Sequence, residues 1–217
     1  MNINDTFLIH SQKAESRIYI ICKKVLDCIG ALAGLILLSP LLLLISLLIK
    51  LENPSSAILF KQIRVGKHGE RFTMYKFRTM VSEADTLLEE IKVHNEIHGK
   101  MFKIKNDPRI TKIGKCLRQT SLDELPQLWN VLTGSMSLVG PRPPLEREVA
   151  EYTLYEIKRL SVIPGCTGLW QISGRNELDF YDMLRLDFTY INEASLWLDL
   201  KIIVMTIPVM ITRKGAF

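Results

Sequence analysis

The longest uninterrupted apolar run, Cys28 to Ile49, has 22 residues and no charged side chain. About 20 apolar residues in a helix are enough to cross a bilayer, but Ser39-Pro40 stands near the middle of this run. A proline inside a helix removes one backbone hydrogen bond and kinks the helix. The pattern predicts a broken membrane helix that either spans with a kink or enters the bilayer and returns to the same face.

Basic side chains flank this run at both ends. Lys and Arg prefer the cytoplasmic side of a membrane, so basic residues at both ends agree with a re-entrant helix whose two ends are on that side. A kinked spanning helix is the alternative. In the re-entrant form the Ser39 hydroxyl is expected to donate to a carbonyl that the kink releases. The flanking residues are Lys13, Arg17, Lys23 and Lys24 before the run and Lys50, Lys61, Arg64 and Lys67 after it.

Alternating β-branched and aromatic residues predict a β-hairpin from Ile58 to Met80 with a turn at Gly66 to Gly69. The hairpin is strongly basic, and Lys76 and Arg78 are candidates for binding a substrate phosphate. Contact with lipid headgroups and plain solvation are the other interpretations of these charges.

The rest of the chain is predicted to be mainly helical, which gives an α+β fold, predominantly helical with a basic β-hairpin. Ile110 to Leu117 is a short basic segment. The final apolar segment is interrupted by two charged residues and a proline, so an interfacial helix or a buried core helix is expected there. The predicted helices are Ser82 to Glu96, Glu146 to Leu160, Phe180 to Asn192 and Leu196 to Thr212.

The chain is organised around one stretch, Arg118 to Gln127, in which two carboxylates are adjacent. Ser121 and, three residues later, Glu124 have the form of a capping box ahead of an apolar run. Pro126 is tolerated only in the first turn, so the helix is predicted to begin near Asp123. Both carboxylates would then lie at the positive end of that helix.

Successive helical residues point about 100° apart, so Asp123 and Glu124 are poorly placed to share one proton. Separate roles as nucleophile and metal ligand are the functional interpretation. The structural alternative is that both residues only cap the helix.

Two arginines stand in loops whose backbone is restricted. Arg142 lies among three prolines, and Arg175 ends the Gly-rich segment Pro164 to Asn176. A guanidinium held in this way suits bidentate phosphate binding. An exposed arginine in an ordinary turn is the alternative.

The net charge of +5 is unevenly distributed, with 15 basic and 8 acidic residues from Lys50 to Thr120 but 9 basic and 12 acidic from Ser121 to Phe217. The basic part is expected to face nucleic acid, an anionic membrane surface or phosphorylated substrates. Four dispersed cysteines without a Cys-x-x-Cys motif argue against zinc and agree with a soluble part in reducing cytosol.

Several short motifs stand in a fixed order along the chain. They are Lys23-Lys24-x-x-Asp27, Tyr75 to Met80, Asn106 to Arg109, Thr120 to Leu128, Gly140 to Pro143 and Pro164-Gly165-x-Thr167-Gly168. This combination resembles the bacterial sugar transferase family, the monotopic polyprenyl-phosphate phosphoglycosyl transferases. The resemblance covers nearly the whole chain from Lys23 onward, and only Lys24 departs from it, where many members have arginine.

The resemblance implies transfer of a sugar 1-phosphate from a UDP-sugar to undecaprenyl phosphate, with release of UMP and dependence on Mg²⁺. It implies that Asp123 is the nucleophile of a phosphosugar-enzyme intermediate and that Glu124 binds Mg²⁺. Arg118 and Arg142 match basic positions that serve the phosphates. The Ser39-Pro40 break would make the membrane helix re-entrant.

By the same resemblance, residues 1–22 are an N-terminal arm, 23–51 the re-entrant membrane helix and 52–217 a catalytic domain on the cytoplasmic face of the bacterial inner membrane. The reaction would be the first membrane step of exopolysaccharide, capsule or O-antigen synthesis. UDP-glucose or UDP-galactose is favoured, although no rule separates these sugars from N-acetylated ones. Membrane lipids and downstream glycosyltransferases are further expected partners, and nucleic acid is not.

Two other functions agree with the same residues. A Mg²⁺-dependent pyrophosphatase acting on lipid-linked or nucleotide-sugar substrates would use the acidic pair and the arginines with water as the acceptor. A membrane-anchored adaptor without catalysis would use the basic hairpin alone, and its function would not depend on Asp123.

Overall fold

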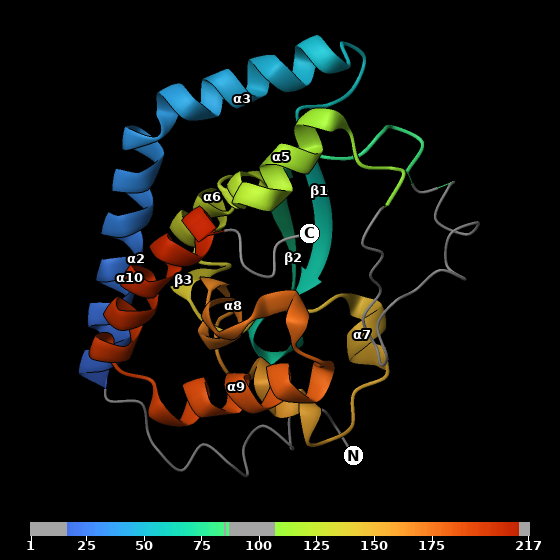
Figure 1. The fold of residues 1–217 in the computed structure, drawn as a ribbon. Coiled ribbons are helices and arrows are strands. Elements are labelled where there is room, and N and C mark those ends of the chain that lie inside the picture. The colour runs from blue at the N-terminus through green and yellow to red at the C-terminus, as the bar shows by residue number, and fades with distance from the viewer. Residues whose placement is uncertain (1–16, 85, 87–106, 213–217) are drawn as a thin grey trace.

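A computed structural model of the chain describes residues 17–84, 86 and 107–212 (Figure 1). Most of the predicted helix Ser82 to Glu96 lies outside these residues, and 82–84 form a turn. The fold is predominantly helical with two small two-stranded sheets, one antiparallel and one parallel.

The predicted break in the apolar segment is confirmed. Helix α2 (Arg17–Leu37) and helix α3 (Ser39–Glu52) are bent by 60° relative to each other, as Figure 1 shows. Pro40 has no N–H for the carbonyl of Ile36, four residues earlier, and the Ser39 hydroxyl donates to this carbonyl at 2.8 Å instead. Among the described helices none is by itself long and apolar enough to cross a membrane, and only this bent pair together passes that test.

The predicted hairpin is also confirmed. Strands β1 (Leu59–Val65) and β2 (Arg71–Phe77) pair antiparallel, and the turn η1 (Lys67–Gly69) joins them. The buried Asn130 of helix α6 (Gln127–Leu132) covers the edge of β2, since its amide accepts from the backbone N–H of Tyr75 and donates to the carbonyl of Thr73. Helix α6 therefore lies between the hairpin and α2, and Met74, Val131 and Ala31 pack together there.

The parallel sheet was not predicted from the sequence. Strands β3 (Ser137–Val139) and β4 (Gly165–Thr167) have three residues each, and Ser137 pairs with Gly165. A Cβ atom on Gly165 would lie 2.0 Å from the backbone nitrogen of Gly140, so the two segments approach as only glycine allows. This contact fixes the loop after β3 against the segment that leads to Arg175.

One predicted helix of the second half is divided in the structure. The predicted helix Glu146 to Leu160 is wrong, because the chain forms α7 (Glu146–Ala150) and a separate 3₁₀ helix η4 (Glu156–Ser161). The Thr153 N–H donates to the Glu156 carboxylate and the Glu156 N–H donates to the Thr153 hydroxyl. This capping box starts a new helix and ends the first. The remaining helices are α5 (Lys112–Thr120), α8 (Leu169–Ser173), η5 (Arg175–Glu177), α9 (Phe180–Glu193) and α10 (Leu196–Thr212).

Helices α2 and α10 meet at a buried carboxylate. Asp199 is 0% exposed and accepts from the Lys23 ammonium at 3.0 Å, the Tyr19 hydroxyl at 3.1 Å and the Tyr190 hydroxyl at 2.7 Å. A buried charge is stable only when it is paired and hydrogen-bonded. Asp199 therefore joins α2, α9 and α10 at one point.

Large apolar side chains remain exposed on the three helices α2, α3 and α10. Contiguous exposed apolar surface in a protein usually marks contact with a partner or a lipid phase. The most exposed of these residues are Ile18, Ile21, Ile29, Ile36, Leu37, Leu43, Leu51, Trp197 and Val204.

Candidate active site

The two adjacent carboxylates lie on a tight turn between helices, not in the first turn of a helix. Helix α5 ends at Thr120, Ser121 has a left-handed backbone with φ of 56°, and a 3₁₀ turn, η3 (Leu122–Glu124), precedes α6. The predicted capping box at Ser121 is therefore wrong. A left-handed residue ends the preceding helix, and the Ser121 hydroxyl accepts from Arg175 instead of capping the next one.

This turn faces a cleft of about 1340 Å³. Residues that are far apart in the sequence line it, from β2, the end of α5, η3, the loop after β3 and the start of η5. All the candidate substrate and metal residues are among them, whereas Ser39 and Pro40 are at the helix bend. The candidates that line the cleft are Lys76, Arg78, Arg118, Asp123, Glu124, Arg142 and Arg175.

Glu124 is held by a lysine of the hairpin. Its Oε1 atom accepts from the Lys76 ammonium at 2.6 Å, and 39% of its side chain is exposed to the cleft. Burial tends to raise the pKa of Glu124, but the charge and hydrogen bond of Lys76, helped by Arg175 and Arg142, bring it below the ordinary value. Glu124 is therefore an ionised acceptor at neutral pH.

The environment of Asp123 shifts its pKa in the opposite direction. The residue is only 8% exposed, and burial raises the pKa of its carboxyl to about 6. The charge of Lys76 opposes this shift and the neighbouring Glu124 carboxylate adds to it. Two adjacent carboxylates whose pKa values move in opposite directions are suited to different chemical roles.

Three arginines surround the turn, each fixed by a different contact. The Arg118 Nε atom donates to the Thr79 hydroxyl at 2.9 Å, and an Arg175 nitrogen donates to the Ser121 hydroxyl at 2.8 Å. Arg142 lies 3.8 Å from the buried Glu148 carboxylate. The structure thus brings Arg118, Arg142 and Arg175 together around the turn, where they line the cleft with positive charge.

Arg78 also lines the cleft but differs from the three, because its Nε atom donates to the Ala57 carbonyl at 2.9 Å and not to a residue beside the turn.

The cleft also contains polar atoms without a hydrogen-bond partner among the described residues. They are Nε1 of Trp170, Oε1 of Gln171 and Nη1 of Arg142, whose ion pair with Glu148 at 3.8 Å is too long for a hydrogen bond. Buried polar groups in proteins are nearly always paired, and an unpaired one in a cleft points to a ligand. Trp170 and Gln171 stand in the Gly-rich segment Pro164 to Asn176, in which only Arg175 is a predicted site residue.

The donor set fits Mg²⁺ bound together with a substrate. Among the described residues no three His, Cys, Asp or Glu side chains form a metal-binding group. Mg²⁺ is commonly held by one or two carboxylates, several waters and substrate phosphates. Glu124, which already accepts from a cation, and its neighbour Asp123 supply hard oxygen atoms of this type.

Comparison with known proteins identifies relatives over nearly the whole chain. Residues 18–213 match the model of the family described as bacterial sugar transferase. The chain is 46% identical to the galactosyl transferase CpsE of Streptococcus agalactiae serotype III and 42% identical to the undecaprenyl-phosphate galactose phosphotransferase of Salmonella typhimurium. These alignments cover 95% and 90% of this chain, but only 46% and 41% of the relatives.

A third relative has a similar length. The exopolysaccharide production protein ExoY of Rhizobium meliloti is 40% identical, and the alignment covers 90% of this chain and 88% of the relative. The chain thus spans less than half of the two longer relatives and most of ExoY. With the family model matched from residue 18 to residue 213, the chain belongs to the bacterial sugar transferase family.

Proposed function

We propose that the protein transfers a sugar 1-phosphate from a UDP-sugar to undecaprenyl phosphate and releases UMP. The observation that carries this proposal is the buried Asp123 carboxylate, which lies in one cleft with Glu124, Lys76 and three arginines. The similarity to the Salmonella relative, an undecaprenyl-phosphate galactose phosphotransferase, supports it. The names of the two most similar relatives reported above both refer to galactose or galactosyl transfer and make UDP-galactose the first donor to test.

In the first step the ionised Asp123 carboxylate attacks the β-phosphorus of the UDP-sugar. The new bond joins a carboxylate oxygen to phosphorus, the bond from phosphorus to the bridging oxygen breaks, and UMP leaves with that electron pair. Arg118, Arg142 and Arg175 stabilise the negative charge that develops on the phosphate oxygens. Because Asp123 is buried, water has little access to the acyl phosphate.

In the second step a phosphate oxygen of undecaprenyl phosphate attacks the same phosphorus. The acyl phosphate bond breaks and the Asp123 carboxylate is regenerated, so no proton or other reactant is consumed. A covalent intermediate lets two unlike substrates use one site in turn.

Glu124 is the candidate ligand for Mg²⁺, with Asp123 beside it. When bound, this ion would neutralise phosphate charge and act as a Lewis acid toward the phosphoryl group. In the described structure Lys76 supplies positive charge to Glu124, which keeps this carboxylate ionised.

The bent helix pair supports attachment to one face of the bacterial cytoplasmic membrane. The lipid acceptor reaches the carboxylates only if the cleft lies at the membrane surface. A re-entrant α2–α3 pair with exposed apolar side chains would hold it there. The sugar transfer would then begin a polysaccharide repeat unit on the cytoplasmic side.

The direct test is isolation of the covalent intermediate. Wild-type protein incubated with UDP-galactose labelled in its β-phosphate, without lipid, should release one equivalent of UMP and retain label that undecaprenyl phosphate removes. Asp123→Asn should retain none, and Asp182→Asn on the surface of α9 should behave like wild type. Label on Asp123→Asn would exclude this nucleophile, and steady release of UMP and galactose 1-phosphate without lipid would indicate a pyrophosphatase.

A further inference from the structure

The cleft has an apolar half that the reacting groups do not use. Its volume of about 1340 Å³ exceeds the roughly 300–1,000 Å³ typical of a pocket for one small ligand. Beyond the carboxylates and arginines, Leu26 of α2, Leu138 of β3 and several residues of α10 line the same cleft. The lining is therefore cationic around the carboxylates and mainly apolar where α2, β3 and α10 contribute, with Thr206 as a polar exception on α10; this second part is the apolar half.

Helix α10 presents one face to this apolar half. Leu200, Ile203, Ile207 and Met210 line the cleft, and their spacing of three, four and three residues places them on one side of a helix. Ile202 is fully buried in the core. Met205, which is 41% exposed and stands two residues before Ile207, roughly opposite it on the helix, does not line the cleft. Helix α10 thus has separate core, cleft and outer faces.

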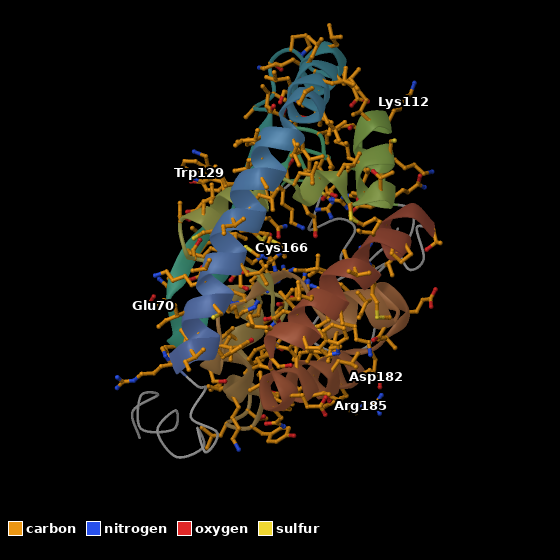
Figure 2. The ribbon with its side chains drawn as sticks, turned by 90° about the vertical axis from the view of Figure 1, so that its left-hand side faces the viewer. Glu70, Lys112, Trp129, Cys166, Asp182 and Arg185 are labelled. Carbon is orange, nitrogen blue, oxygen red and sulfur yellow. The ribbon has the colours of Figure 1, made fainter. Side chains whose placement is uncertain are left out.

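Helices α2 and α10 form the two walls of the apolar half. They are held together where Lys23 contacts Asp199 and diverge from there, with Cys166 of β4 between them (Figure 2). Both helices also carry exposed apolar residues on their outer faces, such as Ile29 and Val204. An apolar chain that enters between α2 and α10 would therefore pass from their apolar outer faces to the apolar half of the cleft.

We propose that the hydrocarbon chain of the lipid phosphate acceptor lies between α2 and α10, against the cleft face of α10. This inference rests on the proposed function and adds to it the place where the lipid binds. A UDP-sugar is polar throughout and gains nothing from apolar walls. A prenyl phosphate has one anionic end for the arginines and a long chain that gains free energy when it leaves water.

The test separates the two half-reactions. Ile207→Trp and Met210→Trp narrow the apolar half, and Met205→Trp, on the outer face of α10, is the matched control. Stoichiometric UMP release without lipid should be unchanged in all three, which also shows that they fold. The KM for undecaprenyl phosphate should rise at least about tenfold in the two cleft variants, which corresponds to about 1.4 kcal/mol of binding, and stay within about twofold in the control.

A second measurement uses farnesyl phosphate, a short acceptor, beside undecaprenyl phosphate. Wild type should prefer the longer chain, and Ile207→Trp should reduce this preference, because only the long chain reaches that far along α10. Equal effects of Met205→Trp and Ile207→Trp, or an unchanged KM in both cleft variants, would overturn the proposal. Failure of wild-type protein to release UMP without lipid would instead contradict the two-step mechanism.

Discussion

Asp123 is predicted to destabilise the folded protein at neutral pH. Its pKa rises from 3.8 to about 6 on folding, so the folded state binds the proton more tightly than the unfolded state. Above pH 6 both states are ionised, and the two-unit shift corresponds to roughly 1–3 kcal/mol lost by the folded state. Asp123→Asn should therefore raise the Tm at pH 8, and this gain should shrink as the pH falls from 6 to 4.

Thermal unfolding in detergent as a function of pH measures this effect, with Asp182→Asn as the control. Asp182 is on the exposed face of α9 beside Arg185, where a substitution changes stability by at most about 0.5 kcal/mol. An Asp123→Asn variant that is less stable than wild type at pH 8 would show that the carboxylate is stabilised in the fold.

Lys76 is predicted to set the pH range in which Asp123 reacts. The proposed first half-reaction needs the ionised carboxylate, so its rate should fall as the pH decreases below about 6. Since the charge of Lys76 lowers the pKa of Asp123, Lys76→Met should move this decline to higher pH. Single-turnover UMP release across pH 5–9 reports the shift, and Lys61→Met, on an exposed part of β1 outside the cleft, should leave the profile unchanged.

The residues of the candidate site could be named from the sequence, but their contacts could not. Asp123, Glu124 and the arginines stand in recognisable motifs. The bond between Lys76 and Glu124 joins residues 48 positions apart, and no local pattern predicts such a pair. The capping motif at Ser121 does not form a cap, because the backbone of Ser121 is left-handed and its hydroxyl accepts a hydrogen bond from Arg175.

At the scale of elements, the bend between α2 and α3 is predicted to set the membrane topology. Replacing Ser39 by Ala and Pro40 by Leu restores a backbone donor for Ile36 and leaves about 22 apolar residues in one helix, enough to span a bilayer. A fraction of molecules should then change from the re-entrant to the spanning form. Ser46→Ala is the control, since Ser46 also donates to a helix carbonyl, that of Leu42, but has no proline beside it.

Cysteine labelling of whole cells measures this topology. In a background without the native cysteines, Arg17→Cys and Asn53→Cys should both be protected from an impermeant reagent. With the bend removed, one of the two sites should become labelled in part of the population. If one site is labelled while Ser39-Pro40 is intact, the helix spans the membrane and the re-entrant topology is wrong.

The helices and strands that follow from a local sequence pattern were predicted correctly. The hairpin, α9 and α10 follow from alternation or helical periodicity in contiguous segments. The sheet β3–β4 could not be found in this way, because each strand has three residues and the two pair across 28 positions. The capping box at Thr153 was visible in the sequence, but the helical pattern of the charged segment around it masked the break.

At the scale of the molecule, Asp199 is predicted to be required for joining the first and last described helices. Asp199→Leu would leave the Lys23 ammonium, which is 16% exposed, without its partner, and breaking a buried pair in this way costs about 3–5 kcal/mol. The double variant Lys23→Met, Asp199→Leu should recover much of that loss, because replacement of a buried pair by apolar residues is often neutral.

Urea unfolding in detergent measures the four members of this double-mutant cycle, with Asp182→Leu as a surface control that should change little. Additive losses in the double variant would mean that Lys23 and Asp199 do not stabilise each other. The hydroxyls of Tyr19 and Tyr190 lose an acceptor in both Asp199 variants, so their effect cancels in the comparison.

The long separation of Lys23 and Asp199 in the sequence also determines which parts of the protein form first during synthesis. Asp199 leaves the ribosome 176 residues after Lys23, which at usual elongation rates is a delay on the order of 10–30 s. The apolar helices α2 and α3 are therefore available to the membrane long before α10 exists. Until α10 arrives, the cleft lacks one wall. With the membrane attachment proposed above, a nascent chain would reach the bilayer first and would become able to bind its substrates only afterwards.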